Sequence, residues 1–465
     1  MTNAIGTSAR DGHLVRRGVP GQRRPHVVLV NAWHDDNKGD SAITEGVLRL
    51  VSEICPESRV SVVGLTEHAD PSSDAMRHVA RSHPQARLYP NPMPSELRGD
   101  TRATPLVDVP IWFTRLLPPV AATLVGRVPG CYRRLFADAD LVIGVGGSNL
   151  YTDVSVQPLV SLARLFTLVA PLNAAVRLRI PTVLLGHTLG PFPRSRPGAR
   201  LLARRMLAGV SATVVRDETS LRVARALGVT DAELAPDMAY AITSEHSDRV
   251  RDLANRRTGG MARTAVVAMR SHPSLGDTAD ERLIGEIVDA VRSLTDQGYI
   301  DHVLVVAHTL GPTPIEDDRA VSRSVREALH RRAIPCTYID DDLGPAELAA
   351  LYGYAACMIA VRLHAAVLAT LSGTPTFAIA YFSAKSEGVM RTAGLADAVG
   401  TFAEVTGSEI VEALTRQMTS PDGRSRLASV ADAHRETLRR SAYRWLAPIT
   451  TDPDTHPAHT NEEPQ

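Results

Sequence analysis

The chain has 465 residues, which is too long for a single hydrophobic core and suits two domains of ordinary size with tails. Its formal net charge at pH 7 is zero and charges of both signs are mixed along the sequence, so no basic face indicates nucleic-acid binding and any anion site has to be local. The four cysteines show no paired spacing, so we expect neither a zinc site nor a disulfide scaffold, and a reducing, cytoplasmic setting.

The N-terminal residues 1–24 are charged, are punctuated by glycine and proline, and lack the apolar run of an export signal, so we expect a disordered tail. An insertion is expected at about 91–130. Its most apolar part, 106–128, is interrupted by charged residues and prolines and should therefore not span a bilayer. This part is predicted to be a helical lid over a cleft, with contact to a membrane surface as the alternative.

A buried strand at 26–32 is followed by a glycine-containing loop and a helix from 42 to 54. This order suits phosphate binding, but the glycine patterns of dinucleotide-binding folds and of P-loops are both missing. Within the loop, Asp40 is expected to cap the helix, and a role as a base is the alternative.

Lysine is rare in this chain. Only two of the 51 basic residues are lysines, Lys38 and Lys385, and each is expected in a loop directly after a strand. Because a compact ammonium differs from a planar guanidinium in reach and geometry, we interpret both lysines as functional. Their survival by chance is the alternative.

The remaining strands of the first half end in polar or glycine-rich turns. The strand at 139–145 leads into a glycine turn at 146–148, where a backbone can approach a ligand closely, although a tight turn without a ligand is the alternative. A second strand-like run ends at His187. A third ends at Arg216, directly before a helix.

The second half repeats this organisation after a polar linker at 243–263. Its first strand ends at Arg270 and its next strand at His308, where the sequence HTLGP echoes the same letters at 187–191. We therefore predict an α/β protein with two Rossmann-like, doubly wound domains that face each other across a cleft. The domains are expected at 25–242 and 264–446, and a disordered polar tail at 447–465.

The stretch from 357 to 385 carries the strongest signal for a site. It predicts a strand, a helix at 363–371 and a second strand, with Arg362 and His364 where the first strand enters the helix. A helix N-terminus favours anions, and Lys385 is expected in the loop after the second strand. We interpret this as an anion site. The alternative is a structural pair, a carbonyl-capping arginine and a core histidine.

Together these residues resemble the polysaccharide pyruvyl transferase family, whose motifs occur in the family order over roughly residues 26 to 400. The matching positions are Asn37-x-Gly39-Asp40, Gly146-Gly147, Gly190-Pro191, Arg216-Asp217-x-x-Ser220, Asp237, Arg362-Leu-His364, Gly373-x-Pro375, and Tyr381 followed by Lys385. The resemblance implies a GT-B-like fold, phosphoenolpyruvate as the donor and a sugar or glycan as the acceptor. It also implies that Arg216, Arg362 and His364 bind and activate the donor.

Ketal formation from phosphoenolpyruvate needs cations for a carboxylate and a phosphate, a proton donor, and a base for two hydroxyls. We predict His364 as the general acid and Asp40 or Asp153 as the base, without a metal or a cofactor. The residues predicted to bind the donor are Arg216, Arg362, Lys385, Gly146, Gly147, Ser148, Arg270 and His308, and those predicted to bind the acceptor are Asn37, Lys38 and His187. The alternative functions are a nucleotide-sugar glycosyltransferase of the same architecture and a non-catalytic, glycan-binding member of the family.

Overall fold

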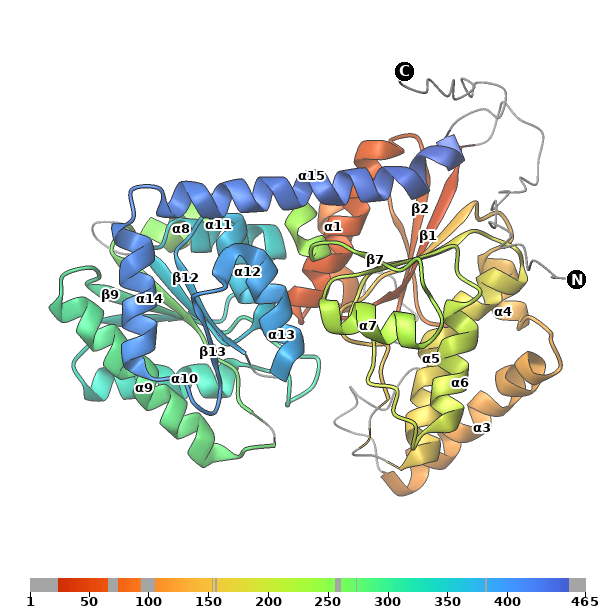
Figure 1. The fold of residues 1–465 in the computed structure, drawn as a ribbon, viewed down its shortest axis with the longest axis horizontal. Helices are drawn as coiled ribbons and strands as arrows, with labels where there is room; N and C mark the ends of the chain where they lie inside the picture. Colours follow the sequence, from red (N-terminus) through yellow and green to blue (C-terminus); the bar gives the residue numbers. More distant parts are fainter. Residues whose placement is uncertain are drawn as a thin grey trace, which may run out of the picture.

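The computed structural model describes residues 24–65, 74–92, 105–152, 154, 157–255, 261–272, 274–380 and 383–450. Within these residues the chain forms two α/β domains that lie side by side, each built on a parallel sheet that carries helices on both faces (Figure 1). The predicted fold class is therefore confirmed.

The N-terminal domain is built on a seven-stranded sheet with the strand order β3-β2-β1-β4-β5-β6-β7. Its strands are β1 (His26–Ala32), β2 (Arg59–Gly64), β3 (Arg87–Tyr89), β4 (Leu141–Gly144), β5 (Thr182–His187), β6 (Ala212–Val215) and β7 (Glu233–Leu234). Its helices are α1 (Lys38–Ile54), α2 (Arg77–Ser82), α3 (Pro105–Leu124), α4 (Gly130–Leu135), α5 (Pro158–Arg177), α6 (Pro197–Leu207) and α7 (Glu218–Ala226), with short 3-10 turns η1 (Asp74–Met76) and η2 (Met238–Ala241).

The C-terminal domain is built on a six-stranded sheet with the order β10-β9-β8-β11-β12-β13. Its strands are β8 (Thr264–Ala268), β9 (His302–Val306), β10 (Cys336–Ile339), β11 (Cys357–Ala360), β12 (Thr376–Ala380) and β13 (Val399–Thr401). The helices that follow β7 are α8 (Asp248–Asn255), α9 (Asp277–Asp296), α10 (Arg319–Arg331), α11 (Pro345–Gly353), α12 (Leu363–Leu371), α13 (Ser383–Met390), the π-helix η3 (Arg391–Leu395), α14 (Gly407–Thr419) and α15 (Gly423–Thr450).

The strand order reverses at one point in each sheet. In the first sheet β1 lies between β2 and β4, and in the second β8 lies between β9 and β11. Ligands of open α/β sheets bind outside the carboxyl ends of the strands at such a point. Here the two carboxyl edges meet, because an isolated bridge joins Asn37 after β1 to Thr309 after β9. The fold therefore places any site of this kind between the domains.

Two hydrophobic cores hold the sheets. Val27 and Leu29 of β1 belong to a core that continues into the C-terminal domain, whereas Val28 and Val30 face a second core beneath α4, α5 and α6. Because helices cover both faces of the sheet, the strand is apolar at successive positions instead of alternating. The shared core packs the two domains against each other.

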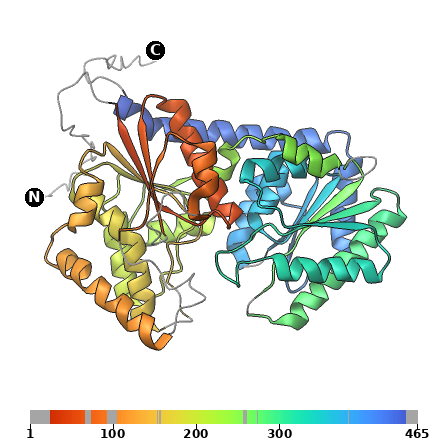
Figure 2. The same cartoon turned by 180° about the vertical axis from the view of Figure 1, so that it is seen from behind.

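The last helix, α15, joins the domains along one side (Figures 1 and 2). It contacts α12 and α14 in the C-terminal domain and α1 and η2 in the N-terminal domain. The thiol of Cys55 donates to the carbonyl of Leu446 over 3.3 Å. The helix reaches Thr450, so residues 447–450 are helical and not disordered as predicted, and 451–465 lie outside the described residues.

The longest apolar helices lie in the N-terminal domain. Among the described residues, α5 is the one helix that is long and apolar enough to cross a membrane, and 61% of its apolar window is buried. Leu165, Val169 and Leu172 of this helix belong to the second core, which is typical of a core helix of a folded domain. The predicted lid region contains α3.

Lys38 does not line a binding site, contrary to its predicted role. Its side chain is 1% exposed, and its Nζ donates to Asp342 of the other domain over 2.5 Å and contacts His78 Nε2 at 2.9 Å. Arg77 also donates to the Asp342 carboxylate, over 2.5 and 2.7 Å. Although partial burial disfavours its charge, the bonds from His78 and Arg77 and the Lys38 ammonium hold the pKa of Asp342 well below its usual range. Lys38 therefore belongs to an ion-pair cluster between the domains.

We expect Asp342→Ala to destabilise the protein by about 1–3 kcal/mol, because it leaves the buried ammonium of Lys38 without its carboxylate. Urea unfolding measures this loss. The matched control is Asp341→Ala, which removes only a 3.3 Å pair with the partly exposed Arg249 and should cost less than about 1 kcal/mol. Equal losses in the two variants would contradict the role of the cluster.

One further expectation is wrong: Lys385 lies in α13 and not in a loop after β12. The HTLGP sequences lie at the carboxyl ends of β5 and β9, as predicted. These strands hold different positions in their sheets: β5 lies on the β4 side of β1, whereas β9 lies on the opposite side of β8 from β11. The echo is therefore not an equivalent element of two repeated domains.

Candidate functional site

Arg216 is held in place by the turn between β6 and α7. Asp217 is the N-cap of α7, and its carboxylate accepts hydrogen bonds from the backbone N and the Oγ of Ser220, both over 2.7 Å. Thr188 Oγ1 donates to Asp217 over 3.1 Å and accepts from Arg216 Nε over 2.8 Å. The Arg-Asp-x-x-Ser spacing is thus explained by helix capping, which fixes the arginine beside it.

Asp237 connects Arg216 with His364 across the domain boundary. Arg216 Nη1 donates to Asp237 Oδ2 over 2.6 Å, and His364 Nε2 lies 3.4 Å from the same oxygen and 3.3 Å from Nη1. The Asp237 side chain is fully buried. Although burial by itself would raise it, the Arg216 guanidinium and the His364 imidazole hold the pKa of Asp237 well below its usual range. This cluster joins a cation, a carboxylate and an imidazole from both domains.

His364 lies where two helix N-termini meet. Arg362 is the N-cap of α12, so His364 falls in the first turn of that helix, as the sequence predicted. Gly39, in the first turn of α1, packs directly on the imidazole: a Cβ at this position would lie 2.2 Å from Nδ1. The positive ends of α1 and α12 both favour an anion next to the histidine.

We expect Gly39→Ala to displace the imidazole and to lower the rate of a reaction that uses His364 by about 100-fold, an effect that a misplacement of about 1 Å can have. The matched control is Gly285→Ala in α9, where a new Cβ meets nothing within 4 Å and should leave turnover unchanged. Steady-state kinetics of both variants test this. Full activity of Gly39→Ala would show that the ring position is unimportant.

Asp40 borders the glycine turn after β4. A Cβ on Gly147 would lie 2.8 Å from Asp40 Oδ1 and 3.4 Å from Arg216 Nη2. The exposed Ser148 accepts a hydrogen bond from Arg216 Nη2 over 3.2 Å. Burial raises the pKa of Asp40, and the nearby His364 charge opposes this only in part. The structure thus brings Asp40, Gly147, Ser148 and Arg216 together, as predicted from their positions after strands.

Asn37, and not Asp40, caps α1. Its Oδ1 accepts from the backbone N of Gly39 over 3.2 Å and of Asp40 over 3.4 Å, which corrects the capping role predicted for Asp40, whereas the acceptor-binding role of Asn37 stays a prediction. Its Nδ2 donates to Glu316 Oε1 over 3.5 Å. Sequence reasoning missed Glu316, whose charge acts on Asp40. The acidic run at 316–318, close behind an HTLGP loop, was the available signal.

Most of the guanidinium of Arg362 is hydrogen-bonded within its own domain. Nε and Nη2 both donate to the Asp318 carboxylate, over 3.0 and 2.7 Å, and Nη2 donates to the Glu316 carbonyl over 2.5 Å. Of the three guanidinium nitrogens, Nη1 is the one that makes no hydrogen bond to a described residue. This arrangement fits the structural alternative for Arg362, because its Nε/Nη2 fork is not available to a ligand carboxylate. Asp318, which sequence reasoning missed, is its partner.

His187 and His308 are core histidines, which corrects their predicted binding roles. His187 is fully buried with Nε2 3.0 Å from the Gly144 carbonyl, and burial lowers its pKa to about 4. His308 is 1% exposed with Nδ1 2.9 Å from the Tyr352 hydroxyl, and burial together with the Arg362 charge lowers its pKa well below the usual value. Burial raises the pKa of Asp318, and the charges of Arg362 and then Arg270 oppose this in part, which places Arg270 near that carboxyl.

Three predicted positions lie outside this description. Asp153 and Tyr381 are outside the described residues, and the side chain of Lys385 is as well. Their predicted roles stay predictions. Gly146 takes a φ of +150° in the turn before Ser148, a conformation that glycine adopts readily.

The sequence matches the family model of polysaccharide pyruvyl transferases over residues 37–383. This range contains Arg216, Asp237 and His364, which together we call the interdomain cluster. The amylovoran biosynthesis protein AmsJ of Erwinia amylovora is 24% identical over 395 residues, which cover 79% of this chain and 86% of that protein.

The fold resembles that of sugar-nucleotide enzymes. The UDP-N-acetylglucosamine 2-epimerase of Neisseria meningitidis, bound to UDP-GlcNAc, matches with a TM-score of 0.55 and 12% identity over 92% of this chain and 100% of that chain. HepE of Anabaena in complex with UDP matches with a TM-score of 0.52 and 13% identity over 92% of this chain and 99% of that chain. At such identities the likeness shows the GT-B-type fold alone.

Proposed function

The chain belongs to the polysaccharide pyruvyl transferase family, and from this membership we propose that it transfers a pyruvyl group from phosphoenolpyruvate to two hydroxyls of a sugar or glycan, which closes a cyclic ketal. The reaction takes place in the cytoplasm, in keeping with four free cysteines.

One observation carries this proposal: Arg216 and Asp237 of one domain meet His364 of the other, beside Gly39 and Gly147, which follow the switch-point strands β1 and β4. A donor with a carboxylate and a phosphate needs a cation whose N–H groups are held in a fixed orientation. Arg216 provides one through Nη2, because Thr188 and Asp237 hold its Nε and Nη1 while Nη2 reaches the exposed Ser148. The N-termini of α1 and α12 add two positive helix ends.

In the proposed reaction His364 gives a proton from Nδ1 to the methylene carbon of phosphoenolpyruvate, which becomes a methyl group. Nδ1 is the donor because Nε2 lies against Asp237 and Arg216. The first sugar hydroxyl attacks the central carbon and loses its proton. As the second hydroxyl attacks the same carbon, the bond from that carbon to the phosphate oxygen breaks. Asp40 passes one of the two hydroxyl protons to the departing phosphate, and the other restores His364. The products are the ketal and inorganic phosphate.

Asp40 is the base for the attacking hydroxyls. Its carboxylate lies beside Gly147 and under the influence of His364, and its raised pKa brings its basicity closer to neutral pH. Ser148 and the turn after β4 lie where the donor meets Arg216. Asp237 keeps its charge, orients the imidazole and stabilises the imidazolium that the reaction needs.

Thermal unfolding tests the donor first. Phosphoenolpyruvate should raise the melting temperature, whereas UDP- and GDP-sugars should not. Incubation with a panel of sugar and glycan acceptors, followed by mass spectrometry, should then show an acceptor mass gain equal to pyruvate less water, together with one inorganic phosphate. Stabilisation by a nucleotide sugar alone would favour the glycosyltransferase alternative. Donor binding without turnover on any acceptor would favour the non-catalytic one.

A further inference from the structure

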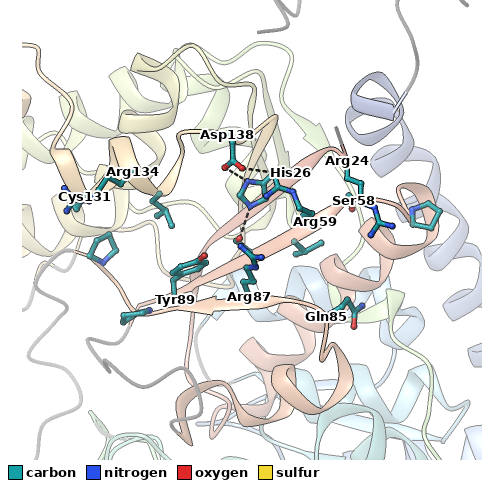
Figure 3. Close-up of a pocket in the computed structure, with 16 residues that line it drawn as sticks. Arg24, His26, Ser58, Arg59, Gln85, Arg87, Tyr89, Cys131, Arg134 and Asp138 are labelled. Carbon is teal, nitrogen blue, oxygen red and sulfur yellow. Dashed lines mark hydrogen bonds and ion pairs between the residues drawn. The ribbon is translucent and has the colours of Figure 1, made fainter. Parts of the chain in front are cut away.

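A pocket of about 700 Å³ lies at the amino-terminal ends of the first strands of the N-terminal sheet (Figure 3). The interdomain cluster lies beyond the carboxyl ends of the strands. The pocket is bounded by the first residues of β1, β2 and β3 and by α4 with the turn that follows it. Its volume suits a ligand the size of a nucleotide. The proposed reaction does not use this edge of the sheet.

The polar residues at the floor of the pocket bind one another and so have a structural role. Asp138 accepts from Arg59 Nη2 over 2.7 Å and lies 2.9 Å from His26 Nδ1, and His26 Nε2 lies 2.8 Å from Ser61 Oγ. These bonds hold the starts of β1 and β2 to the turn before β4. Burial lowers the pKa of His26, so at neutral pH the cationic charge of the pocket comes from arginines.

Two other arginines of the pocket have no structural role of this kind. Arg87 and Arg134 are exposed, and neither side chain makes a hydrogen bond or an ion pair with any described residue. They reach the pocket from separate elements, the edge strand β3 and helix α4. The lining contains one carboxylate, Asp138, against four arginines. The pocket therefore holds excess positive charge within a concave surface.

Tyr89 supplies a flat apolar wall next to this charge. It is 36% exposed, and because it lies two residues beyond Arg87 on β3 the two side chains share one face of the sheet. Figure 3 shows both among the residues that line the pocket, and Pro90 and Pro92 of the following segment line it as well. Arginines beside an aromatic ring can hold a phosphate and stack on a base.

We propose that this pocket is a second ligand site that binds a nucleoside phosphate, with the phosphates on Arg87 and Arg134 and the base against Tyr89. The concave shape favours a small molecule over a flat membrane surface. The site lies on the face of the sheet that carries the second core, far along β1 from the interdomain cluster. Its occupation is independent of the proposed pyruvyl transfer.

Cysteine protection tests the site on the full chain. Cys131 lines the pocket and is partly exposed, and Cys336, equally partly exposed, lies in the other domain as an internal control. With ADP as the probe, alkylation of Cys131 followed by mass spectrometry should slow in a saturable way, while Cys336 should react as before. Absence of protection, or equal protection of both thiols, overturns the proposal.

Substitutions then localise the phosphates and the base. Arg87→Ala and Arg134→Ala should each weaken ADP binding by about 10- to 100-fold, and Tyr89→Ala should weaken it less. Arg133→Ala is the matched control, because Arg133 is the exposed neighbour of Arg134 and does not line the pocket. Unchanged affinity in both arginine variants, or inorganic phosphate protecting Cys131 as well as ADP does, overturns the assignment.

Discussion

Replacing His364 with glutamine is expected to lower turnover by about 100- to 10,000-fold while phosphoenolpyruvate still binds. Glutamine can retain a hydrogen bond to Asp237, which lies 3.4 Å from the imidazole Nε2, but it has no proton to give to the donor carbon. Steady-state kinetics and donor-induced thermal stabilisation measure the two effects separately. Loss of turnover with intact binding identifies an interaction made only in the transition state.

The matched control is His302→Gln at the start of β9, where Nε2 contacts Thr337 Oγ1 over 2.9 Å, far from the carboxyl edge of the sheet. This variant should turn over as the parent does. Unchanged turnover in His364→Gln would remove the acid role from His364. A variant that fails to fold would make the histidine a core residue.

Replacing Asp237 with asparagine is expected to cost about 3–5 kcal/mol of stability, because it leaves the buried Arg216 guanidinium without its counter-charge. Asparagine keeps the Oδ1 that accepts from the Ala239 backbone over 2.9 Å, so the η2 turn should persist. Activity should fall as well, since both Arg216 and His364 lose the carboxylate that orients them. Urea unfolding at neutral pH measures the stability.

The pH dependence of this loss has a definite sign. The folded pKa of Asp237 is depressed, so its carboxylate contributes stability that is fully present above the unfolded pKa of about 3.9. That contribution disappears as pH falls through the lower folded pKa. The gap between parent and variant should therefore narrow below about pH 4. The control Asp248→Asn, on an exposed pair with Arg251, should change stability by less than about 0.5 kcal/mol. An equally small loss in Asp237→Asn would contradict the buried pair.

Local sequence was enough to predict many of the elements and where Arg216, Arg362 and His364 lie within them. The apolar run at 357–361 became β11, the helical spacing that follows became α12, and Arg362 and His364 fell at the strand-to-helix turn as predicted. Repeated strand and helix signals gave the fold class, because a parallel sheet covered on both faces needs continuous apolar strands. Arg216 was found in the same way, at the end of a strand and before a helix.

Tertiary structure alone decided what each charged side chain binds. Lys38 and Asp342 are 304 positions apart, Arg216 and His364 are 148 apart, and Arg362 and Asp318 are 44 apart, so no local pattern relates these partners. A cation after a strand has the same sequence pattern whether it meets a ligand or a buried carboxylate. Lys38 and Arg362 both bind carboxylates, because burying an unpaired charge is costly. Lys38 finds its carboxylate, Asp342, across the domain contact, and Arg362 finds Asp318 in the loop before α10.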